Sequence, residues 1–197
     1  TPPAMASTDR AFRALGRAEP EVFVAFLRAV APDLVTREPD TDLVQLEPTQ
    51  LDSLAPPQDA DWVATMGPKT LLHVECQGYR DTTFLDRLFR YHLGLVLRYW
   101  PRRVRSVALW LIVPPKRQRR DTIVVGDVTA RVTSVVVPEI PSELLLSSPR
   151  TACFAAGANR GAWSDDELCR RVATALASRR ASWAERHMAV VAAAMRK

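Results

Sequence analysis

Two acidic residues, Asp61 and Glu75, have a spacing that could build a metal site. They lie in two segments, 60–66 (ADWVATM) and 70–77 (TLLHVECQ), which a Gly-Pro-Lys turn at 67–69 separates. This pattern predicts a β-hairpin, and a turn centred on its proline would place Asp61 directly opposite Glu75. Facing carboxylates repel each other unless a cation lies between them, and Mg²⁺ is a hard cation that binds one or two carboxylates.

The alternation of side chains along a strand decides what shares a face with this carboxylate pair. His73 and Gln77 fall on the face of Glu75, where His73 is a candidate acid or base or a hydrogen-bonded structural residue. A shift of the turn by one residue would separate Asp61 from Glu75. An exposed acidic pair on an edge hairpin is therefore the structural alternative to a metal site. The residues expected on the opposite face, toward the core, are Trp62, Val74 and Cys76.

Further helices and strands must position this hairpin. Two helices are expected before it, at 8–17 and from Pro20 to a stop at Pro32, and an amphipathic helix is expected after it, at 82–99. The long segment 37–59 is interpreted as a functional loop with a short strand at 43–46. The remaining expected elements are strands at 104–113, 122–125 and 130–137 and helices at 164–178, with a Ser164–Glu167 capping box, and at 181–196. The apolar side chains expected in the core include Trp100, Trp110, Trp183, Met188 and Val191.

The composition is that of an ordinary globular chain with an uneven charge distribution. Of the 197 residues, 47% are hydrophobic and 25% are charged, close to the averages of globular domains. The formal net charge is +5, and residues 60–120 alone carry twelve basic and four acidic side chains. A concentrated basic segment is what a nucleic-acid-binding surface needs. A general preference for arginine, in a chain with only three lysines, is the alternative explanation.

Several functional classes lack support in the sequence. No apolar run is long enough to span a bilayer and no signal peptide is recognised, so a cytoplasmic protein without membrane contact is expected. The three cysteines, Cys76, Cys153 and Cys169, show no CxxC spacing, which argues against a zinc site and a disulfide framework. The motifs of α/β-hydrolases, P-loop NTPases and dinucleotide-binding proteins do not occur.

The central part of the chain resembles a known family. Asp61, followed by Glu75-Cys76-Gln77 at the end of an apolar strand, resembles the D…(D/E)xK core of the PD-(D/E)XK nucleases, in an E-x-Q variant. The segment LLHVECQGYRDTTFLDRLFRY is similar to the recombination-promoting nuclease (Rpn) and transposase-like group, whose next helix carries R-x-x-x-Y, here Arg87 and Tyr91. The N-terminal helices and the segment SELLLSSPRTACFAAG also resemble this group.

The resemblance implies a metal site. Asp61 and Glu75 would hold the metal, with the backbone carbonyl of Cys76 as a further ligand. An acid from the N-terminal helices often completes such sites, and Glu21 is preferred over Glu19 because it lies one turn into its helix. The metal would be Mg²⁺, with Mn²⁺ as a substitute.

The resemblance also implies catalytic and DNA-binding residues. Asp61, Glu75 and Gln77 would form the catalytic set. Gln77 stands where most family members have a lysine that orients or activates the attacking water, and glutamine can hydrogen-bond but carries no charge. DNA phosphates would be contacted by a group of basic side chains, namely Arg87, Arg90, Lys116, Arg117, Arg119 and Arg120.

We therefore expect an α/β protein with a PD-(D/E)XK restriction-endonuclease-like core. A mixed central sheet flanked by helices would occupy residues 1–140, and a helical C-terminal extension at 141–197 would pack on it. The expected function is Mg²⁺-dependent endonucleolytic hydrolysis of DNA. DNA is the expected partner, and a homodimer is left open. The alternative is a nuclease-fold module that binds DNA or protein with weak or no catalysis, which Gln77 favours.

Overall fold

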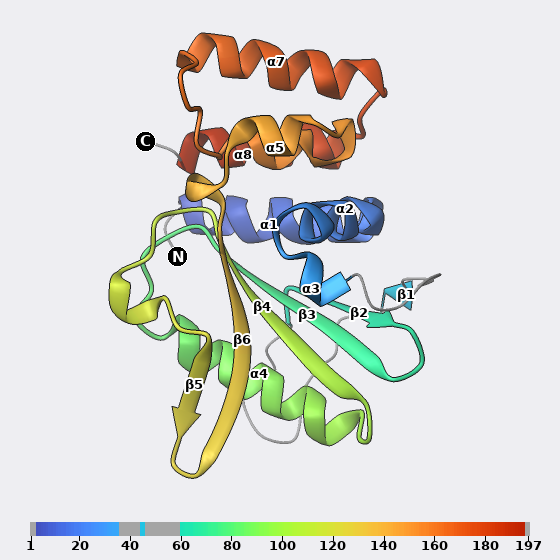
Figure 1. Ribbon diagram of the computed structural model, residues 1–197, viewed down its shortest axis with the longest axis vertical. Coiled ribbons are helices and arrows are strands. Elements are labelled where there is room, and N and C mark those ends of the chain that lie inside the picture. Colours follow the sequence, from blue (N-terminus) through green and yellow to red (C-terminus); the bar gives the residue numbers. More distant parts are fainter. Residues whose placement is uncertain (1–2, 36–43, 46–59, 196–197) are drawn as a thin grey trace.

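The computed structural model describes residues 3–35, 44–45 and 60–195 and contains a six-stranded mixed sheet (Figure 1). The strand order is β1-β2-β3-β4-β6-β5, in which β4 runs parallel to both β3 and β6 and the other neighbours are antiparallel. The strands are β1 (Val44–Gln45), β2 (Trp62–Met66), β3 (Thr70–Gln77), β4 (Arg103–Trp110), β5 (Thr122–Val125) and β6 (Val128–Val136). An α/β protein with a mixed sheet flanked by helices is thus confirmed.

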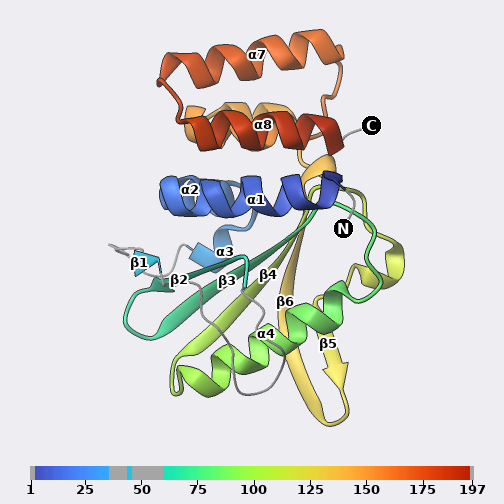
Figure 2. The same ribbon diagram turned by 180° about the vertical axis from the view of Figure 1, so that it is seen from behind.

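Helices cover the two faces of this sheet unequally. One face packs on α4, while α1 and α2 lie across part of the other face, with α5, α8 and α7 stacked beyond them (Figures 1 and 2). The helices are α1 (Pro3–Ala18), α2 (Pro20–Val30), α3 (Pro32–Val35), α4 (Phe84–Arg98), α5 (Ser142–Leu146), α6 (Ala152–Ala155), α7 (Asp165–Ser178) and α8 (Trp183–Met195). Short 3-10 turns occur at η1 (Lys116–Gln118), η2 (Val137–Glu139) and η3 (Pro149–Thr151). None of the described helices is long and apolar enough to cross a membrane.

The hairpin formed by β2 and β3 has the register expected from its turn. Trp62 pairs with Val74 and Met66 with Thr70, so the three residues between the strands close the turn, and Gly67 there adopts a φ of 64°. Asp61 directly precedes β2 and therefore lies opposite Glu75. The predicted pairing of the two acids is confirmed.

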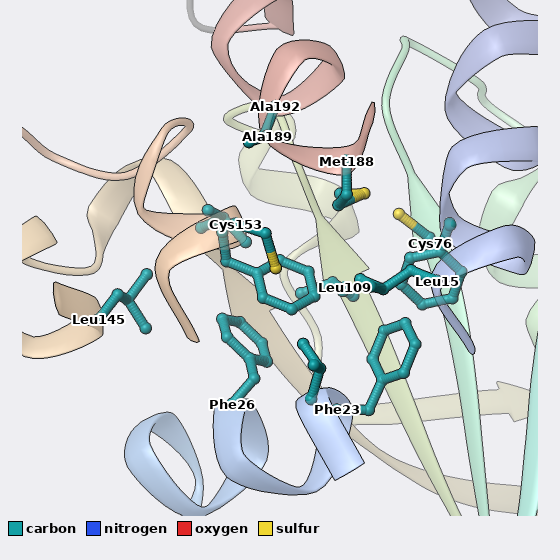
Figure 3. Packing of buried hydrophobic residues seen from close by; sticks show 14 of the residues in the cluster. Leu15, Phe23, Phe26, Cys76, Leu109, Leu145, Cys153, Met188, Ala189 and Ala192 are labelled. Atoms are coloured by element: carbon teal, nitrogen blue, oxygen red, sulfur yellow. The ribbon is translucent and has the colours of Figure 1, made fainter. Parts of the chain in front are cut away.

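The largest part of the core joins the sheet to both terminal helical segments. Trp62, Val74 and Cys76 are buried on the sheet face toward α1 and α2, as the alternation predicted. Figure 3 shows the Cys76 side chain near Leu15 and Met188, which come from α1 and α8. Burial of side chains of this size stabilises the fold by about 2 kcal/mol each. The N-terminal helices and the C-terminal helices therefore share one hydrophobic core.

Two glycines let α1 approach the sheet closely. A Cβ atom at Gly16 would lie 2.5 Å from Cδ1 of Trp62, and a Cβ atom at Gly78 would lie 2.5 Å from Cγ2 of Thr8. Any larger residue at either position would force α1 away from the sheet, at the start of β2 for Gly16 and at the end of β3 for Gly78. This close approach carries the side chains of α1 to the end of the hairpin where Asp61 lies.

Some expectations about the elements are wrong in detail. The strand expected at 104–113 ends at Trp110, whose side chain is buried as expected, and the short helices α5 and α6 were not anticipated. Trp100 is 78% exposed because it lies beyond the last turn of α4, where the chain turns toward β4. Trp183 is 66% exposed and stacks on the ring of His187, one turn further along α8. Of the segment 37–59, only β1 falls within the described residues, and it confirms a short strand there.

Candidate active site

Asp61 and Glu75 are joined by hydrogen bonds at the carboxyl end of β3. The backbone N–H of Asp61 donates to Oε1 of Glu75 at 2.8 Å, and Oδ2 of Asp61 accepts the backbone N–H of Cys76 at 2.9 Å. The side chains of Asp61 and Glu75 are only 6% and 1% exposed. The backbone pairing of β2 with β3 ends at Trp62 and Val74, and the Asp61 carboxylate then supplies the next hydrogen-bond acceptor for β3.

The positive charge that this carboxylate pair requires comes from two arginines on different helices. Arg13 of α1 donates from Nε to Oδ1 of Asp61 at 3.2 Å. Arg87 of α4 places its Nε 3.8 Å from Oε2 of Glu75. Each acid therefore has a guanidinium group beside it, and repulsion between the two acids is largely offset in the folded protein.

Arg87 connects β3 with the loop that leads to α4. Its Nη1 donates to Oδ2 of Asp81 at 2.9 Å, and its Nη2 donates to Oε1 of Gln77 at 3.1 Å. Burial works to lower the pKa of Arg87, but the charges of Glu75, Asp81 and their neighbours outweigh it and raise this pKa. Burial likewise works to raise the pKa of Asp81, whereas hydrogen bonds from Thr83 and the Arg87 charge lower it. Arg87 is therefore a permanent cation committed to this network rather than an arginine exposed to DNA phosphates.

Gln77 also has its side chain engaged. Its amide oxygen accepts from Arg87, and its Nε2 donates to the backbone carbonyl of Tyr79 at 2.6 Å. The Gln77 side chain is fully buried on the same sheet face as Glu75, as predicted. In this arrangement Gln77 fixes Arg87 and the loop after β3 together.

A chain of hydrogen bonds leads from Glu75 through the sheet to α4. His73 Nε2 lies 3.1 Å from Oε1 of Glu75, and its Nδ1 lies 3.0 Å from Oγ of Ser106, which in turn lies 2.9 Å from Nδ1 of His92. Because a carboxylate only accepts, His73 donates from Nε2, its Nδ1 accepts the Ser106 hydroxyl, and Ser106 accepts from His92. The histidine is thus a hydrogen-bonded neighbour of Glu75, one of the two alternatives that the sequence left open.

His73 and His92, the two histidines of this hydrogen-bond chain, are neutral at physiological pH. Burial lowers the pKa of His73 to about 4, against the opposing effect of the Asp61 charge. Burial, together with the nearby His73, also lowers the pKa of His92 to about 4. Tyr91 lies beside them, with its ring 6.1 Å from that of His73, and burial raises its pKa well above the usual value. Among the α4 side chains of this network, Arg87 is therefore the charged one, and His92 and Tyr91 are neutral.

The structure does not bring Glu21 to the carboxylate pair. Glu21 lies at the start of α2, where its Oε1 is 3.6 Å from the guanidinium of Arg150. Within the described ranges, no three His, Cys, Asp or Glu residues cluster so as to hold a metal ion. The Cys76 side chain points into the core (Figure 3). The contact of Cys76 with Asp61 is made by its backbone N–H. Among the acidic side chains that the structure describes, Asp61 and Glu75 are therefore the two that could share a metal ion here, because Glu21 lies elsewhere.

The basic loop at 114–120 lies next to this site. The buried side chain of Gln118 donates to the backbone carbonyl of Asp81 at 2.6 Å and so fastens η1 to the loop before α4. Lys116 and Arg117 are exposed on η1. The other predicted DNA-binding residues have partners within the protein: Arg119 pairs with Glu139 at 2.5 Å, Arg120 donates to the Arg117 carbonyl, and Arg90 donates to the Asp86 carbonyl.

Four residues of this hydrogen-bond and ion-pair network were not found from the sequence. Ser106 is a polar residue inside the apolar strand β4, which is a signal that sequence reasoning can use. Asp81 accepts the N–H and hydroxyl of Thr83 just before α4, a local pattern typical of helix starts. Arg13 and His92 offer no such signal, because their roles arise from helix packing that brings distant segments together.

No family model, curated protein or solved structure matches this chain. The nuclease resemblance therefore rests on the sequence alone, most specifically on the residues between Asp61 and Tyr91. The sheet, the paired acids and the adjoining basic loop are the features from which a function has to be inferred.

Proposed function

We propose that this protein is a metal-dependent DNA endonuclease similar to the Rpn group of PD-(D/E)XK nucleases. The observation that carries the proposal is the juxtaposition of Asp61 and Glu75 at the end of β3. Their oxygens are the hard donors that Mg²⁺ prefers, and the ion commonly uses one or two carboxylates together with water and phosphate oxygens. The donor set thus fits Mg²⁺, or Mn²⁺ in its place.

Arg13 is the side chain that must move for a cation to reach Asp61. The Arg13 side chain is 36% exposed, and its Nε donates to Oδ1 of Asp61 at 3.2 Å. The Asp61 side chain is nearly buried, so an incoming cation would have to replace the charge compensation that Arg13 supplies. Once released, the guanidinium of Arg13 becomes available to a DNA phosphate at the same place.

The remaining residues of the network would orient the reacting groups. Metal bound by Asp61 and Glu75 would polarise the phosphate and lower the pKa of a bound water. His73 and Arg87 contact the Glu75 carboxylate from two sides, while Gln77 positions Arg87. The exposed side chains of Lys116 and Arg117, on the loop fastened to Asp81, would bind the DNA backbone.

A second candidate function is a nuclease-fold module that binds DNA or protein without useful catalysis. The observation that favours it is that Arg13 and Arg87 already compensate both acids. Gln77, which supplies no charge, is also fully occupied with Arg87 and the Tyr79 carbonyl. In such a module Asp61 and Glu75 would stabilise the end of the hairpin.

Cleavage of a supercoiled plasmid separates the two candidates. Wild type, Asp61→Asn and Glu75→Gln are incubated with DNA in Mg²⁺, in Mn²⁺ and in a chelator. Both substitutions preserve size and hydrogen-bonding shape, and Asp86→Asn, an exposed acid of α4, is the matched control. The proposal expects metal-dependent nicking by wild type and by the control and none by the two site variants. Cleavage that survives either site substitution would reject the site, and salt-dependent DNA binding without any cleavage by wild type would favour the second candidate.

A further inference from the structure

A cavity of about 870 Å³ opens where β4 and β6 separate. The two strands pair from Ser106–Val132 to Trp110–Val136, whereas the residues of β4 before Ser106 extend past this ladder. Figure 1 shows the two strands diverging below their paired segment. Val96 near the end of α4, Trp100 just beyond it and Leu34 of α3 also line the cavity. Ligand pockets for small organic molecules have volumes of this size.

This cavity borders the hydrogen-bond network of the candidate active site at Ser106, but its arginines lie toward the opposite end of β4. In the parallel pairing of β3 and β4, Arg103 lies beside Thr70 and Trp110 lies beside Gln77. Glu75 lies beside Ala108, five residues after Arg103, so the arginine end of the cavity and the carboxylate end of the sheet are roughly 16 Å apart along the strand. A ligand here would therefore not compete directly with one bound at Asp61.

The walls of the cavity carry a strong excess of positive charge. Four arginines line it, Arg102, Arg103, Arg105 and Arg131, against one acid, Asp121. Arg105 donates to the carbonyls of Asp33 and Leu34 and so is held in place by α3. The side chains of Arg102, Arg103 and Arg131 form no hydrogen bond or ion pair with any residue that the structure describes. Guanidinium groups that share a cavity repel one another, and a bound anion removes this repulsion.

An aromatic surface stands beside these arginines. Trp100 lines the same cavity and is 78% exposed, although large aromatic side chains are normally buried to a high degree. Its neighbours in the lining, Pro101 and Val96, are apolar. An exposed indole next to guanidinium groups suits a planar base that carries phosphate, because the base stacks on the ring and the phosphate pairs with arginine.

We propose that this cavity binds a nucleotide, either as a small molecule or as the phosphorylated end of a single strand. The base stacks on Trp100, and the phosphates pair with Arg103 and Arg131 from the two diverging strands. The proposal does not depend on the nuclease assignment, because none of these residues belongs to the carboxylate site.

Calorimetric titrations in a chelator test this site without any metal at Asp61 and Glu75. The probes are ATP, adenosine, tripolyphosphate and a 5′-phosphorylated hexanucleotide. We expect ATP to bind more tightly than tripolyphosphate by about tenfold and adenosine to bind weakly, because both stacking and charge contribute. Arg103→Gln/Arg131→Gln should weaken ATP binding by at least about tenfold, and Trp100→Ala should weaken ATP binding while leaving tripolyphosphate unchanged.

A charge-matched control keeps the interpretation specific. Arg17→Gln/Arg170→Gln removes the same charge from exposed positions on α1 and α7 and should bind ATP like wild type. Circular dichroism melts verify that each variant is folded. Tighter binding of ATP than of the hexanucleotide would assign the site to small nucleotides, and the reverse order would assign it to strand ends. No binding of ATP, equal affinity for ATP and tripolyphosphate, or an unchanged affinity in the Arg103→Gln/Arg131→Gln variant would overturn the proposal.

Discussion

The backbone N–H of Asp61 donates a hydrogen bond to the side chain of Glu75, with 2.8 Å between the nitrogen and Oε1. The relative position of the two acids is therefore fixed by the main chain of the hairpin before any ligand binds. A site that is positioned in advance loses less conformational entropy on binding. The same contact means that a substitution at Glu75 also disturbs Asp61.

The buried Glu75 side chain should be far more sensitive to truncation than to neutralisation. Glu75→Ala leaves His73, Arg87 and the Asp61 N–H without their common partner and should lower the free energy of unfolding by about 3 kcal/mol. Glu75→Gln keeps an acceptor for His73 and should cost about 1–2 kcal/mol. Urea unfolding of the three proteins measures both values. Equal costs for the two variants would contradict this assignment of contacts.

Magnesium should stabilise the folded protein through Asp61. At about one hundred times its dissociation constant, an ion that binds only the folded state adds about 2.7 kcal/mol to the free energy of unfolding. Asp61→Asn should lose most of this gain, and in chelator it should be slightly less stable than wild type because Arg13 loses its partner. Thermal melts with magnesium and with chelator, with Asp86→Asn as control, provide the comparison. The same magnesium shift in wild type and Asp61→Asn would show that Asp61 is not a ligand.

Arg87 should not be replaceable by lysine. Three separate nitrogens of its guanidinium group face Asp81, Gln77 and Glu75, and a lysine ammonium cannot reach all three. Arg87→Lys should lower the free energy of unfolding by about 1–3 kcal/mol. Arg90→Lys, on the exposed side of the same helix, should change it by less than about 0.5 kcal/mol. Chemical denaturation of both variants measures these changes. An Arg87→Lys variant as stable as wild type would show that the positive charge alone, and not the three guanidinium contacts, stabilises the fold.

Stability should fall as the pH drops from about 6.5 toward 4. The pKa values of His73 and His92 are lowered to about 4 in the folded protein, so the unfolded chain takes up protons first on acidification. Their contribution is complete above pH 6.5 and is lost toward pH 4, with a slope of up to about 1.4 kcal/mol per pH unit for each histidine. His92→Gln should lose about half of this dependence. An identical pH profile in wild type and His92→Gln would contradict the neutral histidine pair.

Salt dependence should distinguish the exposed from the engaged residues of the basic loop. Lys116 and Arg117 are exposed on η1, so Lys116→Gln/Arg117→Gln should reduce the slope of log K against log salt for duplex DNA by roughly two. Arg119→Gln should change it less, since Arg119 pairs with Glu139. Fluorescence anisotropy at several salt concentrations measures these slopes. The same slope in all three proteins would place the loop outside the DNA interface.

The hairpin was predictable because local rules determine it. The turn at 67–69 fixes which residues pair, and the alternation in β3 then fixes which side chains share the face of Glu75. The Ser164 cap of α7 was predictable for the same reason, and its hydroxyl accepts the N–H of Glu167 as expected. Such patterns extend over a few residues and leave few alternatives.

The charge balance of the site was not predictable, because it depends on packing between distant segments. Arg13 lies 48 residues before Asp61 and reaches it only because α1 crosses the end of the hairpin. The exposure of Trp100 was also missed, since a tryptophan next to an amphipathic helix is expected in the core. Helix propensity and hydrophobic periodicity predict which face of a helix is buried. They do not predict the burial of a residue that lies beyond the last turn of the helix.

The close seating of α1 through Gly16 and Gly78 makes the candidate site sensitive to events far from it. α1 touches the sheet on one side and α8 on the other, and it carries the arginine that faces Asp61. Any displacement of α1 relative to the sheet would therefore also move Arg13 relative to Asp61. A displacement of about 1 Å at that pair is enough to change the electrostatic potential at Asp61.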